Sequence, residues 1–300
     1  MGSKLFRTNA PLFALHTLLL LRHSRQVRKT FKYRVYPTKK QHTLLDEQLA
    51  EACTLYNAAL QERRDAWKMG KTAITHYQQV NQLKYIRAAG DLALANFNSC
   101  ADVLRRVDQT FQAFFRRVKA GQKPGYPRFK PRTRFHSYTF PTYGNGCKLR
   151  KNNRLYIQGV GELKVKLHRP LAGQIKTVTL TKLCRKWYAC FSVVMPDPLP
   201  LPQTGNATGI DVGLASFAVL SDGRAINNPR YHQTAQAKLR RAQRKVARRK
   251  KASNRRRIAV WHLARVHQHI RNKRRDFHHQ VARTLINQYD LIPSSFDHAA

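Results

Sequence analysis

Residues 208–223 read TGIDVGLASFAVLSDG. The apolar residues on either side of Gly213 predict two strands, the first a buried strand that ends at Asp211. Asp222-Gly223 has the composition of a tight turn between strands. A carboxylate presented at a strand end beside a glycine bend is a typical first ligand for a catalytic magnesium ion. One carboxylate does not make a nuclease site, so Asp211 is a candidate catalytic and metal-binding residue that needs partners.

The charge of the chain is the second guide to its function. The 300 residues hold 57 Lys and Arg against 15 Asp and Glu, so the formal net charge is +42. Self-repulsion of this size opposes compaction, and a polyanion relieves it through the release of counterions. Nucleic acid is therefore the expected partner, ahead of a membrane surface or an acidic protein, and no small-molecule substrate is indicated. The apolar content of 42% is ordinary and allows a true core, in about two domains.

The cysteines and the first residues concern the compartment and the start of the protein. None of the five cysteines forms a C-x-x-C pair and no histidine pair completes a zinc pattern, so we expect no zinc and interpret all five as small buried residues. Their odd number is typical of a reducing cytoplasm. The apolar run 10–21 is too short to span a bilayer, and we interpret residues 1–26 as a non-native extension before a true start at Val27. The cysteines are Cys53, Cys100, Cys147, Cys184 and Cys190.

Periodicity in the first part of the chain predicts one strand followed by helices. Residues 30–36 alternate strictly and predict a strand that Pro37 ends. Thr38 and Gln41 have the spacing of a capping box at the start of a helix, and weaker helical periodicity covers 77–86. The apolar stripe of the first helix is Leu45, Leu49, Ala52, Tyr56 and Leu60.

A third helix is expected to open at a capping box formed by Ser99 and Asp102. Its apolar stripe has almost ideal 3–4 spacing, and we interpret it as a helical core. Basic residues occupy the other face, where they are either solvated or in contact with phosphate. The stripe is Leu104, Val107, Phe111, Phe114 and Val118, and the basic residues are Arg105, Arg106, Arg116 and Arg117.

Residues 121–131 break this helix and mix cations with aromatic rings. Loops of this kind stack on bases and grip phosphates, and they also occur as plain connectors, so both interpretations stay open. The candidate nucleic-acid contacts in the loop are Lys123, Tyr126, Arg128, Phe129 and Lys130.

Short strands separated by turns follow from residue 135 to 194. Together with the strand at 30–36, they predict a barrel of about five strands of the oligonucleotide-binding type. The expected fold is therefore α+β and multidomain. Its parts are a barrel at 27–40 and 120–195, a helical insertion at 41–119, a proline-rich linker at 196–207 and a last domain at 208–300.

The last domain carries the most basic segment of the chain. Residues 238–257 contain twelve Lys and Arg, and no Asp or Glu occurs between Gly223 and Asp276. Apolar residues recur there in helical register, so we predict basic helices, broken at Ser253-Asn254, that contact phosphate directly. The histidines that follow are interpreted as helix-surface residues and not as metal ligands. The candidate phosphate contacts are Arg240, Arg241, Arg244, Lys245, Arg248, Arg249, Lys250, Lys251, Arg255, Arg256 and Arg257.

In this order, the motifs resemble those of the TnpB/OrfB family of insertion-sequence proteins, often called transposases. The resemblance covers about Val27 to Ile292. Each motif is weak by itself, and their shared order makes the match specific. The matching pieces are KTFKYRVYPT at 29–38, FFRRVK at 114–119, PGYPRFK at 124–130, KWY at 186–188, GIDVG at 209–213, FAVLSDG at 217–223 and DLI at 290–292.

The resemblance implies an RNA-guided, magnesium-dependent DNA endonuclease, with DNA and a transposon-derived guide RNA as partners. It also implies a RuvC domain of RNase H-like fold, in which Asp211 is the first catalytic carboxylate. The chain departs from the family pattern after Ile292, since Ser295 occupies the slot of the second catalytic Glu, and the family's zinc ribbon and third catalytic Asp do not follow. Asp222 and Asp290 are poorly placed substitutes. We therefore expect an incomplete RuvC domain and no DNA cleavage by this chain alone.

Two other hypotheses stay open. In the first, the chain is a non-catalytic DNA- or RNA-binding module, either a guide-RNA binder or a repressor. In the second, it is a basic RNA-packaging or ribosome-associated protein, a class that does not need the strand-turn-strand context of Asp211. As a nucleic-acid binder from a prokaryote, the protein is expected in the cytoplasm, associated with the nucleoid.

Overall fold

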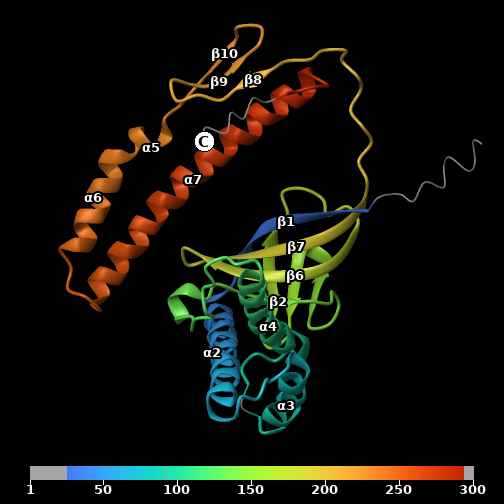
Figure 1. The fold of residues 1–300 in the computed structure, drawn as a ribbon, viewed down its shortest axis with the longest axis vertical. Coiled ribbons are helices and arrows are strands. Elements are labelled where there is room, and N and C mark those ends of the chain that lie inside the picture. Colours follow the sequence, from blue (N-terminus) through green and yellow to red (C-terminus); the bar gives the residue numbers. More distant parts are fainter. Residues whose placement is uncertain (1–25, 91, 294–300) are drawn as a thin grey trace, which may run out of the picture. The chain divides into compact units, whose positions relative to one another are not determined.

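The computed structural model of the chain describes residues 26–90 and 92–293. They form two compact units that divide between Asp197 and Pro198, within the proline-rich segment. The first unit combines a barrel with three helices, and the second combines a small sheet with basic helices (Figure 1). The predicted extension before Val27 and the slot at Ser295 lie outside the described residues, apart from Gln26 in the first strand.

Seven antiparallel strands of the first unit curl into a nearly closed barrel (Figure 1). They are β1 (Gln26–Tyr36), β2 (Ser137–Phe140), β3 (Cys147–Arg150), β4 (Arg154–Ile157), β5 (Gly161–Lys166), β6 (Gln174–Leu183) and β7 (Lys186–Pro196). Their order is β2-β6-β7-β1-β5-β4-β3, so the first strand of the chain lies in the middle of the sheet. The predicted count of five was too low, because two short strands, β2 and β3, were missed. The oligonucleotide-binding type of this barrel stays a prediction.

Alternating burial along the long strands creates the core of the barrel. Successive side chains of a strand point to opposite faces, so every second residue of β7 faces inward. These inward residues are Trp187, Ala189, Phe191 and Val193, which are 0–1% exposed. From β1, Tyr33 meets them, with its ring centroid 5.8 Å from that of Phe191.

Three helices lie against one side of the barrel (Figure 1). They are α2 (Lys39–Gly70), α3 (His76–Ala88) and α4 (Phe97–Lys119). The capping box of Thr38 and Gln41 is present at the start of α2, as predicted. The predicted stripe of α2 is also confirmed, because all five of its residues are buried.

The predicted start of α4 was wrong. Asn96 caps this helix, since its side-chain oxygen accepts a hydrogen bond from the Ser99 amide at 2.9 Å. Asparagine is among the strongest N-capping residues, and the helix therefore begins three positions earlier than a Ser99 cap would place it. Asp102, the supposed acidic member of the box, is buried and forms ion pairs with Arg105 and Arg106.

The helices and the barrel share one hydrophobic core and are not separate bodies. Buried polar bonds connect them: the Tyr138 hydroxyl donates to Oε1 of Gln48 at 2.8 Å, and Nη1 of Arg106 donates to the Ser137 carbonyl at 2.7 Å. Burial without such partners would be costly for these groups. The segment predicted as a helical insertion is therefore part of the same folded unit as the barrel.

The second unit begins with a three-stranded antiparallel sheet of order β10-β9-β8. Its elements are β8 (Ile210–Asp211), β9 (Ser216–Leu220), β10 (Ala225–Asn227), α5 (Tyr231–Thr234), α6 (Gln236–Ala247) and α7 (Asn254–Gln288). After α7, Leu291 forms a parallel bridge with Ala207. The RNase H-like character of this unit stays a prediction.

Burial separates the five cysteines into two groups. Cys53, Cys100 and Cys147 are buried, as predicted, whereas Cys184 and Cys190 are only half-buried. Burial raises the pKa of the Cys100 thiol to about 11, which keeps it protonated at neutral pH. Within the described part of the chain, no helix combines the length and the apolar character that crossing a bilayer requires.

Candidate nucleic-acid interface

Asp211 ends β8, where the structure confirms the predicted strand, bend, strand and turn. It stands opposite Val219 of β9, and the Asp222-Gly223 turn leads into β10. The prediction that β8 is buried was wrong, because Asp211 is exposed and Ile210 is only half-buried. The reason is the length of β8, since a strand of two residues at the edge of a small sheet has few neighbours to cover it.

Asp222 and Asp290, the two carboxylates considered above as substitutes, form hydrogen bonds within the chain itself. Asp290 accepts the backbone N–H groups of Thr204 and Gly205 at 2.8–3.0 Å, and these bonds lower its pKa. The pKa of Asp222 is also lowered, first by the backbone N–H and then by the guanidinium of Arg224. Both carboxylates fix local structure, and neither is available as a simple partner for Asp211.

A two-metal centre does not fit the described residues. Such a centre needs several carboxylates around a pair of ions about 3.5–4 Å apart. In residues 26–90 and 92–293, no group of three or more His, Cys, Asp and Glu side chains lies close enough to hold a metal ion. The catalytic role of Asp211 and its magnesium ligation therefore stay predictions, and we derive no chemical step through a metal here.

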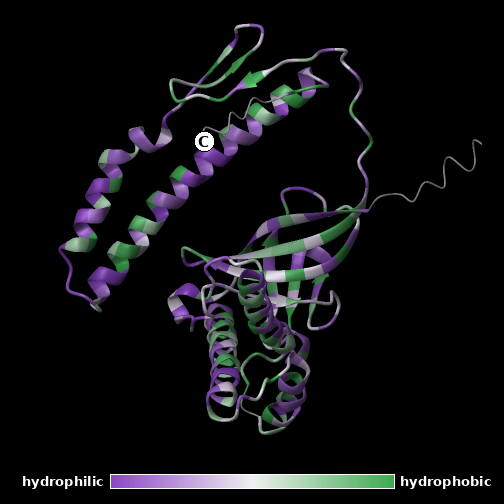
Figure 2. Cartoon of the chain, viewed as in Figure 1, coloured by the Kyte–Doolittle hydropathy of each residue, from purple (hydrophilic) through white to green (hydrophobic). Residues whose placement is uncertain are grey.

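Helices α6 and α7 pack side by side as a hairpin and carry most of the basic residues of the second unit. Leu239 of α6 and Ala259 and Ile270 of α7 are buried, so a narrow apolar stripe is enough to hold the helices in place. The rest of both helices is largely hydrophilic (Figure 2). The two basic helices predicted from the sequence are present, and Ser253 caps α7 by accepting the Arg256 amide at 3.2 Å, but α6 already ends at Ala247.

Most of the cations predicted to contact phosphate face solvent in this hairpin. Arg256 is different, because it is half-buried and its Nη1 donates to the Val246 carbonyl at 2.7 Å, which closes the C-terminal end of α6. The segment 248–253 is a turn and not helix, so its cations project from the tip of the hairpin. The exposed cations are Arg240, Arg241, Arg244, Lys245, Arg248, Arg249, Lys250, Lys251, Arg255 and Arg257.

The four arginines predicted for α4 divide into two kinds. Arg106 is a structural residue, since its guanidinium bonds to Asp102 at 3.1 Å and to Thr139 at 2.7 Å. Arg105 also pairs with Asp102 but is 54% exposed. Arg116 and Arg117 are exposed in the last turn of the helix. Phosphate contact stays a prediction for the exposed arginines, whereas Arg106 is already fully engaged within the fold.

The interpretation of the α4 stripe as core was wrong in its second half. Leu104 and Val107 are buried, but Phe111 and Phe114 are only partly buried and Val118 is 48% exposed. The 3–4 spacing shows which residues share a face but not how far along the helix that face is covered. Tyr126 of the following loop packs on this half of the stripe, with ring centroids 6.0 Å from Phe111 and 5.4 Å from Phe114.

The loop 121–131 is anchored at its end and presents aromatic rings with cations. Lys130 exchanges two 2.9 Å hydrogen bonds with the Asn57 side chain, and its ammonium lies over the Tyr56 ring. Phe129 is 43% exposed, and the guanidinium of Arg64 lies 5.0 Å from its centroid. Sequence reasoning missed Arg64, because no local pattern in α2 shows that this residue lies beside the loop.

Two family models match the chain. One, for the OrfB protein of IS605 with the description "Probable transposase", matches residues 190–293. The other, a "Helix-turn-helix domain" of the same family, matches residues 27–72. In the present structure the latter segment contains strand β1 and the single long helix α2.

Two curated relatives are similar over most of the chain. A protein of Streptomyces pristinaespiralis, named as an RNA-guided DNA endonuclease, is 31% identical over 89% of the chain and 66% of its own length. InsQ of Escherichia coli K12, named in the same way, is 27% identical over 88% of the chain and 65% of its length. The chain thus spans about two thirds of the length of these relatives.

The fold is also similar to that of a solved protein. The Cas12f1 chain in a complex with guide RNA and target DNA superposes with a TM-score of 0.55 at 12% identity. The match covers 90% of the present chain and 81% of the other one. At this low identity the similarity concerns the fold.

Proposed function

The chain belongs to the TnpB/OrfB transposase family, which is related to RNA-guided DNA endonucleases, and from this premise we propose that it binds a guide RNA together with DNA. The RNA would derive from the transposon that encodes the protein. The observation that carries the proposal is the α6–α7 hairpin, on which only positive charges face solvent along residues 236–275. Exposed cations without intervening carboxylates are suited to phosphate neutralisation and the release of counterions.

We propose binding without cleavage as the activity of this chain by itself. Asp211 is the one residue that the family pattern assigns to catalysis among the described residues, and Asp222 and Asp290 are engaged in local structure. A plasmid assay with pure protein, its guide RNA and magnesium tests this proposal directly. Cleavage that is lost in Asp211→Ala would overturn it, whereas intact plasmid together with measurable RNA binding supports a guide-RNA binder or a repressor.

Co-purification tests the identity of the RNA. The full chain is expressed together with the flanking transposon DNA, purified in high salt, and the bound RNA is sequenced. A discrete RNA from the end of the element is the expected result. Heterogeneous RNA that salt removes would contradict guide binding and leave only nonspecific attraction to polyanions.

The salt dependence of affinity tests the hairpin. Each phosphate contact contributes a slope of about one to the dependence of log affinity on log salt. The triple variant Arg240→Ala, Arg241→Ala, Arg244→Ala should therefore reduce the slope by about three. A control with the same loss of charge uses Lys39, Lys40 and Lys68, which are exposed on α2. Equal slopes for the two triple variants would contradict a special role for the hairpin.

A further inference from the structure

The first unit contains a groove of about 800 Å³ that the functions assigned so far do not use. It lies between the end of α2, the segment 72–77 and the second half of α4. Its walls are mainly aromatic, with Trp67, Tyr77 and Phe115 all more than half exposed. Phe111, Phe114 and Tyr126 pack on one another and form a continuous wall. We name this feature the aromatic groove.

Two buried nitrogen atoms of residues that line the groove have no hydrogen-bond partner among the described residues. They are Nη2 of Arg63 and Nδ1 of His76. Arg63 as a whole is only 8% exposed. A buried donor without a partner costs about 1–3 kcal/mol, and for a charged group the cost is higher. This cost in free energy is removed if a ligand in the groove supplies a hydrogen-bond acceptor.

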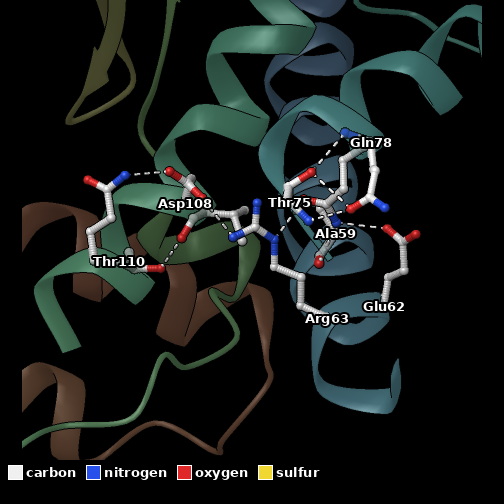
Figure 3. Close-up of polar contacts among 10 residues, drawn as sticks. Ala59, Glu62, Arg63, Thr75, Gln78, Asp108 and Thr110 are labelled. Atoms are coloured by element: carbon white, nitrogen blue, oxygen red, sulfur yellow. Dashed lines mark hydrogen bonds and ion pairs between the residues drawn. The ribbon is translucent and has the colours of Figure 1, made fainter. Parts of the chain in front are cut away.

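Arg63 is held in place by its other contacts (Figure 3). Its Nε donates to Oε1 of Gln79 and its Nη1 to Oδ1 of Asp108, both at 2.9 Å. Gln79 is itself fixed, because its amide donates to the Ala59 carbonyl at 2.9 Å and to Glu62 at 2.7 Å. The guanidinium is therefore preorganised, and its free donor does not have to be ordered when a ligand binds.

Charge and shape together identify the kind of ligand. Bases stack on aromatic side chains, and the N–H groups of arginine donate to the O6 and N7 acceptors of guanine. In Arg63 the Nη2 group remains for these acceptors, because Nε and Nη1 are already engaged. Asp108 also lines the groove, and its two oxygens already accept from Arg63 and Gln112. Exposed cations lie over groove aromatics, since Arg64 is 5.8 Å from the centroid of Tyr126 and Lys71 is 5.8 Å from that of Trp67. These cations would meet the flanking phosphates.

We propose that the aromatic groove binds one unstacked base of a single-stranded nucleic acid, preferentially guanine. The base stacks against Tyr77 and Trp67, and Nη2 of Arg63 donates to its acceptor edge. This inference rests on the proposed function, because it assumes that the chain binds nucleic acid. An apolar peptide would also fill the walls of the groove, and a backbone carbonyl would accept from Arg63, but it carries no phosphate for Arg64 and Lys71.

Fluorescence anisotropy of the full chain with labelled ten-residue oligonucleotides tests the proposal. The probes are oligo-dT and the same sequence with one central dG, dA or dC. We expect the dG probe to bind about tenfold more tightly than the others, which corresponds to about 1.4 kcal/mol, within the usual range for one base contact. Equal affinity for all four probes would overturn the proposal.

Two tyrosines of α3 provide a matched pair of variants. Tyr77 and Tyr85 are 73% and 78% exposed, and only Tyr77 lines the groove. Tyr77→Ala should weaken binding of the dG probe about tenfold, as expected for one lost stacking contact, while Tyr85→Ala leaves it unchanged. Equal effects of the two substitutions would show that the groove is not the binding site.

Arg63→Lys isolates the hydrogen bond from the charge. Lysine keeps a positive charge beside Asp108 but lacks a guanidinium that can bond to Gln79, to Asp108 and to a ligand at the same time. The expected result is loss of the dG preference with unchanged affinity for oligo-dT, and thermal unfolding verifies that the variant is folded. If the wild-type chain binds none of the probes, the proposed function itself fails. If it binds them all without preference and Tyr77→Ala has no effect, only the inference about the groove fails.

Discussion

The two units of the chain bury their apolar side chains to very different extents. In the first unit, buried residues from β1 to β7, α2, α3 and α4 belong to one hydrophobic cluster. In the second unit, the buried apolar residues of the described segments are few and scattered over three elements, β9, α6 and α7. They are Ala218, Leu220, Leu239, Ala259, Ile270 and Leu285.

The charge of the two units helps to explain this difference. A cation-rich helix keeps only a narrow stripe for packing, because the remaining positions are occupied by charges that need water or phosphate. Such charges occupy most of the surface of the α6–α7 hairpin. The first unit therefore derives its stability from burial, and the second is expected to gain much of its stability when a polyanion neutralises it. The predictions below test this contrast.

The largest expected effect is that of a truncation in the barrel core. Phe191 is completely buried on β7, so Phe191→Ala should lower the free energy of unfolding of the first unit by about 3–5 kcal/mol. Native-state hydrogen exchange at the amides of β6 and β7 measures the change. Leu239→Ala, the counterpart in the second unit, should cost about 2 kcal/mol and affect only α6 and α7. Loss of protection in both units with either variant would show that they unfold together.

Limited proteolysis compares the two units without a mutation. We expect a stable fragment that ends near residues 196–202, because the segment beyond it has little buried surface. Addition of RNA should slow cleavage within the second unit and leave cleavage of the first unchanged. A resistant fragment that reaches residue 290 in the absence of RNA would contradict the expected difference in stability.

A cap substitution tests local stability within the hairpin. Ser253→Ala removes the side chain that accepts the Arg256 amide, and it should destabilise the start of α7 by about 1 kcal/mol. The matched control is Ser253→Asp, which keeps an N-capping oxygen. Hydrogen exchange of the first turn of α7 separates the two variants, and equal protection in both would argue that the cap contributes nothing.

The smallest expected effect is a change in the stability of the second unit at acid pH. The pKa of Asp290 is lowered in the folded state by the N–H groups of Thr204 and Gly205, so the unfolded chain binds this proton more readily. The stabilisation is complete above the unfolded pKa of about 3.9 and is lost as the pH falls through the lower folded value. Asp290→Asn should remove this pH dependence, and an unchanged acid profile would disprove the contribution.

Local sequence signals predicted the elements better than they predicted burial. The capping box at Thr38, the helix break at Ser253 and the turn at Asp222-Gly223 depend on residues next to one another in the chain, and all three were correct. At the start of α4 the same kind of reasoning failed, because the Ser99 and Asp102 spacing matches a capping box although Asn96 is the cap. Strands β2 and β3 were missed, and alternation is a weak signal over the four residues that each of them has.

The candidate site was predictable in its composition but not in its geometry. Sequence alone located the basic helices, yet it did not reveal that Arg106 and Arg256 are used by the fold itself. Sequence alone also did not show that Arg63 and His76 lie beside the aromatic end of α4. Their proximity depends on the packing of α2, α3 and α4. Tertiary contacts of this kind have no signature in a local window of sequence.

The central place of β1 in the barrel has a consequence during synthesis on the ribosome. The strand leaves the ribosome early, yet its long neighbour β7 is more than 150 residues further along the chain, as the pairing of Thr30 with Ser192 shows. At about 5–20 residues per second, β1 waits roughly 8–30 s for that neighbour. Helices α2, α3 and α4 emerge in the meantime, so nascent chains expose an unpaired strand edge that chaperones can recognise until translation has passed β7.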